Sequence, residues 1–270
     1  MNGWLIYDEA GAKRNEWFIA RLIEAANARG VALTLKMDRE NWRLEEENLP
    51  DFAIVRTIHP ALNKRLERLG VRCVNNAETS RVANDKWQTY LSCKEWGIPV
   101  LPTQPFTNIN DTKKQEYPLV LKSTDGHGGA EVFWIENERA LKERAQTLDF
   151  AKKKYVLQSP CKTLGKDIRA YVIGGEIVAC VLRESETSFK SNFSLGGKVC
   201  AVQADEEQKK IVLKLYEKLR FDYVGVDFLP SENGYVLNEI EDAAGARMLY
   251  ETSDVDIVEL FIDHIIKTGR

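Results

Sequence analysis

The sequence lacks a long apolar run and any large excess of charge of one sign. Its first apolar segment, at residues 4–7, is short and is soon followed by charged residues, which argues against a signal peptide. No later stretch is apolar for long enough to cross a bilayer, so we expect a cytoplasmic protein without a membrane partner. The net charge is only −3 in 270 residues, so a surface that coats nucleic acid is not expected.

Cysteine is scarce, and its spacing argues against the usual cysteine-based scaffolds. The five cysteines are odd in number, widely separated, and include no C-x-x-C pair. That pattern favours reduced, buried thiols over a disulfide framework or a zinc site. The sequence also has no convincing Ser/His/Asp or Cys/His set, which is consistent with a reaction that needs no covalent protein nucleophile.

The composition is typical of a globular protein, with 44% hydrophobic and 29% charged residues, and the first part of the chain alternates strand and helix patterns. Short apolar runs predict strands at 4–7, 31–37, 51–56 and 71–74, with helices at 15–29 and 60–70 between them. This βαβ rhythm predicts a small N-terminal α/β domain with a parallel sheet, over residues 1–75.

Two further lobes, each of the α+β kind, are expected after residue 75. In residues 76–159, two helices precede strands at 117–122, 131–135 and 155–158 and a helix at 138–148. In residues 160–270, strands at 168–173, 176–183, 223–229 and 235–241 alternate with helices at 205–219 and 254–267. The pair Gly174-Gly175 predicts a tight hairpin turn between the first two of these strands.

Three acidic residues near the C-terminus form the sharpest candidate site. Asp227 lies in VGVDFL, and Glu239 and Glu241 lie in VLNEIE, two segments that resemble strands joined by a turn. Because alternate side chains of a strand share a face, Glu239 and Glu241 point the same way, and antiparallel pairing would bring Asp227 beside them. A hard cation such as Mg²⁺ would offset their repulsion and desolvation. The alternative is ordinary surface acids on an exposed edge hairpin.

A second candidate is Lys122, which ends a strand and precedes a loop containing Gly126, Gly128 and Gly129. One ammonium group and several backbone N–H groups could bind a phosphate there. The loop lacks the Gly-Lys-Ser/Thr of a Walker A motif and leads into a strand, which also excludes a Rossmann fingerprint. A plain hairpin turn is the alternative.

A third candidate combines Asp167 and Arg169, which lie on one side of a strand, with Arg183 at the end of the partner strand. Lys190 and Asn192 follow in a polar segment. Cations grouped in this way could clamp a polyphosphate or an acyl phosphate. Surface ion pairs, which contribute little to stability, are the alternative.

The order of these motifs resembles the ATP-grasp fold, and within it the RimK-like carboxylate–amine ligases. Asn-Ala and Asp-Lys at a helix start are followed by a strand ending in Lys, a Gly-rich loop, a strand ending in Gln, G-x-D-I-R, S-N with Gly-Gly, V-G-V-D and E-x-E. The resemblance is strong over residues 76–245 and weaker before them, where it implies a preceding α/β domain. It also implies that ATP binds between two α+β lobes.

The same resemblance implies roles for individual residues. Lys86 and Lys122 would contact the ATP phosphates or the adenine side, and the loop from Gly126 to Gly129 would cover the phosphates. Adenine would bind at a hinge formed by Gln158, Ser159, Pro160 and Cys161, and Asp167 would lie near the nucleotide sugar. Arg169 and Arg183 would face the transferred phosphoryl group or the acceptor carboxylate, and Lys190 and Asn192 would contact the nucleotide. Two Mg²⁺ ions, with Mn²⁺ as a substitute, would be held by Asp227, Glu239 and Glu241.

Three positions depart from the family pattern. Ser159 stands where the family often has Glu, Glu241 where it usually has Asn, and Lys190 where it often has Arg. Metal binding survives the second change because a carboxylate also binds Mg²⁺, whereas lysine is a poorer bidentate clamp than arginine. The segment 242–247 also lacks the Ser-Pro common there, so substrate choice stays open.

The implied function is an ATP-dependent ligase. A carboxylate attacks the γ-phosphate, an amine attacks the resulting acyl phosphate, and an amide, ADP and phosphate are released. An amino acid joined to a peptide, a protein tail or a small-molecule carboxylate fits this scheme, with Arg14, Arg56 and His59 as candidates for reading the acceptor. Self-association stays open by analogy. The alternatives are a non-catalytic ATP-binding module of a larger assembly and an ATP-dependent small-molecule kinase.

Overall fold

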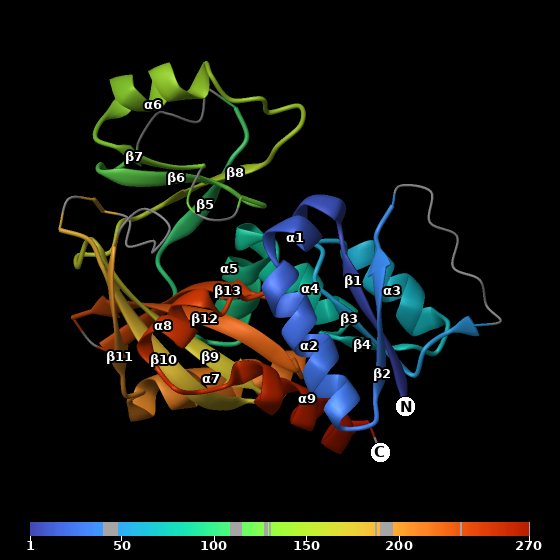
Figure 1. Ribbon diagram of the computed structural model, residues 1–270. Coiled ribbons are helices and arrows are strands. Elements are labelled where there is room, and N and C mark those ends of the chain that lie inside the picture. Colours follow the sequence, from blue (N-terminus) through green and yellow to red (C-terminus); the bar gives the residue numbers. More distant parts are fainter. Residues whose placement is uncertain are drawn as a thin grey trace.

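The computed structural model describes residues 1–39, 48–108, 115–126, 129, 131–186, 188–189, 197–232 and 234–269. Gly128, Lys190 and Asn192 lie outside these described residues. Within the described ranges the strands form three sheets, and Figure 1 shows the first and last of them side by side with the central sheet standing above. The predicted fold class is confirmed, because a parallel N-terminal sheet precedes two antiparallel sheets with helices.

The N-terminal sheet has the strand order β2-β1-β3-β4 and is parallel throughout, as predicted. Its strands are β1 (Asn2–Tyr7), β2 (Ala32–Met37), β3 (Phe52–Val55) and β4 (Arg72–Val74), and its helices are α1 (Glu9–Arg14), α2 (Glu16–Ala28) and α3 (Pro60–Arg68). Helix α2 buries Phe18, Leu22 and Ala26 at helical spacing. Helix α1 was not predicted; the Asp8 carboxylate caps it by accepting the Gly11 N–H.

The central sheet is antiparallel and has the strand order β5-β8-β6-β7. It consists of β5 (Thr103–Phe106), β6 (Leu119–Ser123), β7 (Val132–Ile135) and β8 (Tyr155–Gln158). Helix α6 (Glu138–Ala145) covers one face, where Leu141 and Ala145 pack against the strands. Strand β5 was not predicted because Pro105 interrupts its pattern; the proline is tolerated at the edge of the sheet.

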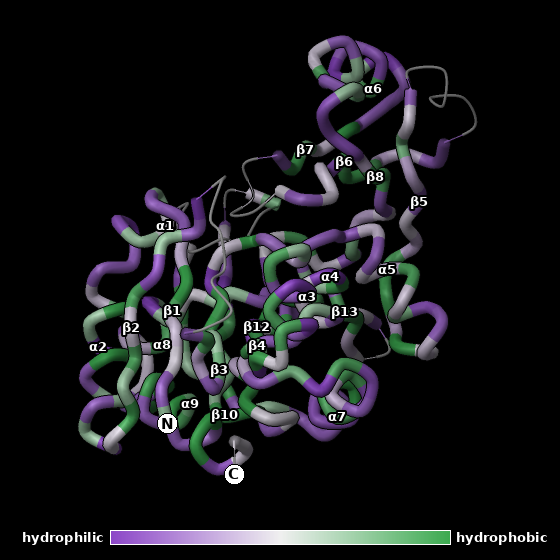
Figure 2. Tube along the Cα trace, turned by 90° about the vertical axis from the view of Figure 1, so that its right-hand side faces the viewer, coloured by the Kyte–Doolittle hydropathy of each residue, from purple (hydrophilic) through white to green (hydrophobic). Residues whose placement is uncertain are grey.

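The C-terminal sheet is antiparallel, with the strand order β11-β10-β9-β12-β13. Its elements are β9 (Lys166–Ile173), β10 (Glu176–Glu184), β11 (Lys198–Val202), α7 (Glu206–Leu219), β12 (Tyr223–Ser231), β13 (Gly234–Glu241), α8 (Arg247–Thr252) and α9 (Ile257–Thr268). The sequence did not indicate β11 or α8. Figure 2 shows apolar residues concentrated along the strands and hydrophilic ones on the outer loops.

This sheet is buried on both faces, and the alternation of side chains along β9 decides what each face carries. Ala170 and Val172 pack in a core with α7, whereas Tyr171 and Ile173 pack in a core shared with the N-terminal sheet and its helix α2. Asp167 and Arg169 have the same parity as Tyr171. The polar residues of β9 therefore belong to the face that the N-terminal part of the molecule covers.

Helices α4 (Ala77–Ala83) and α5 (Lys86–Glu95) connect the sheets. Helix α4 contacts α3 and β13, and α5 contacts both β13 and β5. The three sheets fall within residues 1–75, 76–159 and 160–270, and the division into domains at these boundaries remains a proposal. In the described part of the chain, no helix combines the length and apolar character needed to cross a membrane.

Candidate functional site

A cavity of about 630 Å³ lies between the central sheet, the C-terminal sheet and the N-terminal part of the chain, which contributes residues of α1 and α2 and Arg56 to the wall. Nearly all of the described site residues predicted from the sequence line it. They are Lys86, Lys122, Gly126, Gly129, Gln158, Pro160, Cys161, Asp167, Arg169, Arg183, Asp227, Glu239 and Glu241. Ser159 is the exception among the described members of the predicted set. Segments up to 155 residues apart in sequence, such as Lys86 and Glu241, thus face one space.

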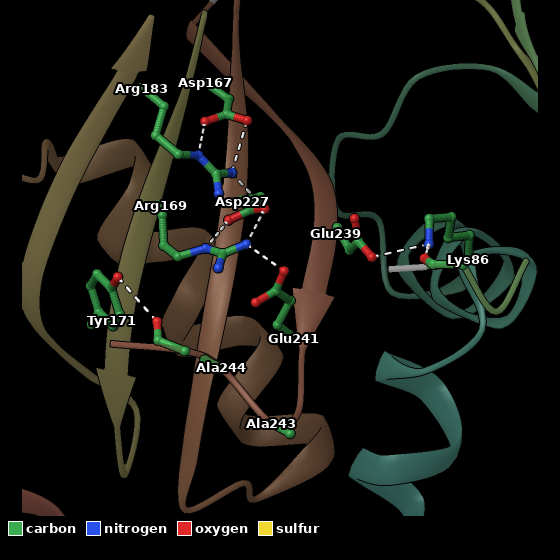
Figure 3. Close-up of polar contacts among 12 residues, drawn as sticks. Lys86, Asp167, Arg169, Tyr171, Arg183, Asp227, Glu239, Glu241, Ala243 and Ala244 are labelled. Carbon is green, nitrogen blue, oxygen red and sulfur yellow. Dashed lines mark hydrogen bonds and ion pairs between the residues drawn. The ribbon is translucent and has the colours of Figure 1, made fainter. Parts of the chain in front are cut away.

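The wall formed by β9, β10, β12 and β13 carries a buried network of two arginines and three acids (Figure 3). Arg169 donates from Nε and Nη2 to the two carboxylate oxygens of Asp227, at 2.7 Å each, and its Nη2 lies 2.6 Å from Glu241 Oε1. Arg183 Nη2 donates to Asp227 Oδ2 at 2.7 Å and to Asp167 Oδ2 at 2.8 Å. We call this set the arginine–acid wall; it is not the surface pairing that was the alternative.

Pairing across the sheet creates this wall. Asp227 is in register with Arg169, and Arg183 is in register with Asp167, so each arginine faces an acid on the next strand. Asp227 is 4% exposed, which rules out an ordinary surface acid on an edge hairpin. Charged groups are tolerated at this depth only when they are paired and hydrogen bonded, as they are here.

The pKa values of two acids of the wall shift in opposite directions, although burial acts on both in the same way. Burial opposes ionisation of Asp227, yet the nearby charges of Arg169 and Arg183 and their hydrogen bonds lower the pKa of its carboxyl below the ordinary value. For Glu241, burial raises the pKa above the ordinary value, and Arg169 only partly offsets this effect. The arginines therefore favour the ionised form of Asp227, and of these two acids Glu241 is the more readily protonated.

A bulge in the β12–β13 pairing adds a residue that sequence reasoning missed. Asp227 pairs with Glu239, but the next residue, Phe228, pairs with Leu237, so Asn238 is the extra residue of β13. Both Asn238 and Glu239 line the cavity. A strict two-residue alternation would have sent Asn238 to the opposite face, and the bulge that overrides it has no clear signature in the sequence.

Lys122 is the main cation on the side of the cavity formed by the central sheet. Its Nζ donates to Gln158 Oε1 at 2.7 Å and to Asn238 Oδ1 at 3.1 Å, both neutral acceptors. Burial lowers the pKa of Lys122 to about 8, against the attraction of Glu239 and with the repulsion of Lys86. A poorly compensated ammonium near the end of β6 is suited to bind an anion, and the binding of a phosphate by Lys122 stays a prediction.

Lys86 ties the glycine loop to the acidic strand. Its Nζ lies 3.1 Å from Glu239 Oε1 and also donates to the carbonyl oxygen of Gly126. A Cβ at Gly126 would lie 2.2 Å from Ser123 Oγ, so glycine is required there by close approach and not by a special φ. Lys86, the first residue of α5, thus holds Gly126 at the cavity wall.

The acids of the cavity have the chemistry of magnesium ligands. Asp227, Glu239 and Glu241 supply hard carboxylate oxygens from adjacent strands to one cavity, which fits Mg²⁺. Each is held by a cation, and among the described residues no three His, Cys, Asp or Glu side chains converge closely enough to enclose one ion. Oxygen donors from a nucleotide and release from these cations are needed to complete a site, so the ligand assignment stays a prediction.

The segment predicted to hold adenine lies along the cavity, but not with every residue. Gln158, Pro160 and Cys161 line the cavity. The Ser159 N–H donates to the Pro102 carbonyl oxygen at 2.9 Å, so this donor is already used within the chain. The adenine-binding role of the segment remains a prediction.

Residues of α2 and α8 line one end of the cavity, which we call the α2–α8 end, and the residues expected to read the acceptor belong to this part of the molecule. Arg14 and Arg56 line it, whereas His59 is absent from the lining and pairs with Asp38 at 2.9 Å. Residues that sequence reasoning missed here are Trp17, Phe18, Arg247, Met248, Tyr250 and Glu251. Their elements, α2 and α8, are far apart in sequence, and no local pattern connects them.

Comparisons with known proteins agree with the geometry. Residues 93–265 match the model of the RimK-like ATP-grasp domain. The chain is 30% identical over 244 residues to the probable alpha-L-glutamate ligase of Histophilus somni (strain 2336), covering 84% of this chain and 81% of the relative.

Solved structures extend the likeness to the whole fold. The crystal structure of the D-cycloserine synthetase DcsG has a TM-score of 0.77 at 16% identity, over 100% of both chains. The ATP-grasp ligase PsnB, in complex with a phosphomimetic variant of its minimal precursor, Mg and ADP, has a TM-score of 0.74 at 15% identity, over 99% of this chain and 98% of that one.

Proposed function

The chain belongs to the RimK-like ATP-grasp family, and we propose that its cavity activates a carboxylate with ATP and joins it to the amine of an amino acid. The protein is an ATP-dependent carboxylate–amine ligase, and ATP with Mg²⁺ is the nucleotide form that its family uses. The acceptor proposed here is a carboxylate on a small molecule, a peptide or a protein tail. The observation that carries the proposal is the convergence of the arginine–acid wall with Lys86 and Lys122 on one cavity.

We propose that the lysines and arginines of the cavity stabilise the negative charge that develops during phosphoryl transfer. Lys86 and Lys122 would hold the polyphosphate from the side of the central sheet, and Arg169 and Arg183 would face the transferred phosphoryl group and the reacting carboxylate. Preorganised cations in a shielded cavity stabilise such a transition state without reorganising. Asp227, Glu239 and Glu241 would hold Mg²⁺, which would neutralise further negative charge on the phosphates. Two ions are proposed.

This scheme requires no covalent intermediate on the protein. The carboxylate oxygen attacks the γ-phosphorus and ADP leaves; the amine then attacks the acyl carbon, phosphate leaves, and the amine gives up a proton. The enzyme contributes position and charge at both steps. The scheme agrees with the described members of the proposed site, which include no nucleophile–base pair.

The decisive experiment measures ADP release with a panel of amino acids and short peptides, and identifies the products by mass spectrometry. A ligase releases ADP only when Mg²⁺ and a suitable carboxylate are present, and hydroxylamine traps its acyl phosphate as a hydroxamate. A small-molecule kinase would instead form a stable phosphorylated product and no amide. A non-catalytic module would bind ATP and release no ADP, and either result would overturn the proposal.

A further inference from the structure

Arg56 is a buried cation without a carboxylate partner. It follows β3, is 9% exposed, and lines the cavity. Throughout the described chain no Asp or Glu lies within ion-pair distance of its guanidinium group. The nearby Asp242 accepts instead from Asn75 at 2.7 Å and Asn84 at 3.1 Å. A buried charge usually requires a counter-charge, and among the described residues only Asp242 supplies one, at a distance beyond that of an ion pair.

The hydrogen bonds of Arg56 leave one donor group free. Its Nε donates to Tyr7 Oη at 3.3 Å, and its Nη2 donates to the carbonyl oxygens of Ala243 at 3.3 Å and Ala244 at 2.9 Å. These bonds use three of the five guanidinium N–H groups. Within the described residues Nη1 has no hydrogen-bond partner, so two N–H groups remain for a ligand.

The surroundings of Arg56 are aromatic, with further cations nearer the solvent. Its guanidinium lies 5.0 Å from the ring centre of Phe18 and 5.9 Å from that of Tyr223. Aromatic faces hold a guanidinium in place and exclude water from it, without neutralising it. Arg14 and Arg247, both exposed, line the same cavity.

A second feature of this end of the cavity also points to a ligand. Trp17 is 58% exposed although it lies on the cavity wall, where its ring makes an edge contact with Tyr250 at 5.1 Å between ring centres. Trp17 adjoins Phe18, the ring nearest to Arg56, and an exposed large apolar side chain close to a buried cation suits a ligand that is both apolar and anionic.

We propose that Arg56 binds a carboxylate that does not react, on the amino acid or peptide substrate at the α2–α8 end of the cavity. The inference rests on the ligase function and adds to it a specificity-determining residue and a substrate class: acids in which a second carboxylate remains free after ligation. Arg14 and Arg247 draw the anion in, and Trp17 and Tyr250 contact its apolar part. Arg56 selects a charged carboxylate over a neutral group of the same shape, because the neutral group would leave its guanidinium without a counter-charge.

A purely structural role for Arg56 predicts something different. Its Nη2 clasps the carbonyl oxygens that follow Glu241, so the residue could serve only to position that loop. Loss of such a role would lower kcat for every substrate alike. Loss of carboxylate binding would raise KM for the free acid and leave KM for the corresponding amide unchanged.

The test uses the full chain and a panel of amino acids, each supplied as the free acid and as its primary carboxamides, with ADP release as the readout. The wild-type enzyme is expected to show a KM about 10- to 100-fold lower for an active acid than for one of its amides. Arg56→Gln should remove that difference, and Arg56→Lys should recover part of it. ATP binding, measured by calorimetry with a non-hydrolysable analogue, should change less than about threefold in either variant.

Arg72→Gln is the matched control. Arg72 also donates to a backbone carbonyl, that of Ile265 at 3.1 Å, but it pairs with Asp222 outside the cavity. Its loss should lower thermal stability and leave the preference for acid over amide intact. Equal KM values for acid and amide in the wild type, or an Arg56→Gln enzyme that keeps the preference, would overturn the role of Arg56 while leaving the ligase in place. ADP release with no member of the panel would overturn both.

Discussion

The two buried arginine environments of this cavity are built on opposite principles. In the arginine–acid wall, Arg169 and Arg183 face three acids, and the charges nearly cancel. At the α2–α8 end, Arg56 is surrounded by rings and carbonyl oxygens, and its charge is not cancelled. A balanced network holds its shape without a ligand, whereas an unbalanced cation obtains its counter-charge from one. The first environment therefore suits chemistry common to a family, and the second suits selection among substrates.

Removing an acid from the arginine–acid wall should have the largest effect on stability and activity. Asp227→Asn leaves both arginines without the carboxylate that they share, and removal of one partner from a buried ion network costs about 3–5 kcal/mol. We expect a variant that unfolds at markedly lower urea and releases no ADP. Glu232→Gln is the control, because its pair with Lys162 is 68% and 75% exposed and should contribute less than about 1 kcal/mol. Equal unfolding midpoints for the two variants would contradict the stabilising role of Asp227.

Removing an acid that the arginines do not hold separates chemistry from folding. Among the described residues, Lys86 is the one ion-pair partner of Glu239, which is partly exposed. Glu239→Gln should lower ADP release by about 100-fold or more, because charge neutralisation by Mg²⁺ contributes several kcal/mol to transition states of this kind. The thermal unfolding temperature should move by less than about 3 °C, since less than 1 kcal/mol of stability is at stake. An active Glu239→Gln enzyme would remove this residue from the metal site.

Lys122 should make nucleotide binding depend on pH, which the arginines cannot do because they stay protonated. Its pKa of about 8 means that the ammonium is charged below that pH and loses its proton above it. Binding of an ATP analogue should therefore be tight at pH 7 and weaken toward a limit of about tenfold per pH unit above pH 8. Lys122→Arg should give a flat profile over pH 7–9, because arginine stays protonated. Calorimetric titrations at each pH measure both, and parallel profiles would exclude Lys122 as the titrating group.

The smallest expected effect concerns the glycine loop. A Cβ at Gly126 would lie 2.2 Å from Ser123 Oγ, which donates to Glu131 at 2.8 Å. Gly126→Ala should displace the loop and raise KM for ATP by about three- to tenfold, a cost of roughly 1 kcal/mol. Ser123→Ala combined with Gly126→Ala should recover part of the loss, since it removes the clashing oxygen. Absence of any recovery would show that the loop is constrained elsewhere.

Much of the fold followed from periodicity, and the exceptions have identifiable causes. The parallel N-terminal sheet and the α+β units were predicted because buried strands are apolar runs and helices have 3.6-residue spacing. Helices α1 and α8 were missed because six residues are too few for a period to emerge. Strand β5 was missed because its proline is acceptable only at a sheet edge, a position that pairing decides.

In the candidate site, too, some residues could be predicted from the sequence and others could not. Asp227, Glu239 and Glu241 were singled out because acids within apolar strands are costly unless something compensates them. What compensates them in this structure are arginines and a lysine from β9, β10 and α5, and this depends on strand order and register. Asn238 entered the cavity through a bulge, a feature of pairing that one strand alone does not specify.

The sequence by itself determined which residue types are present in which order, and local physics was enough to read strands, helices, the glycine loop and the acids from them. Only the tertiary structure decided that Arg169 and Arg183 are neutralised while Arg56 is not. Whether an arginine has a counter-charge depends on distances across the sheets and between α2, β3 and α8. Electrostatic energy depends on those distances and on burial, and the neighbouring residues in the sequence determine neither of them.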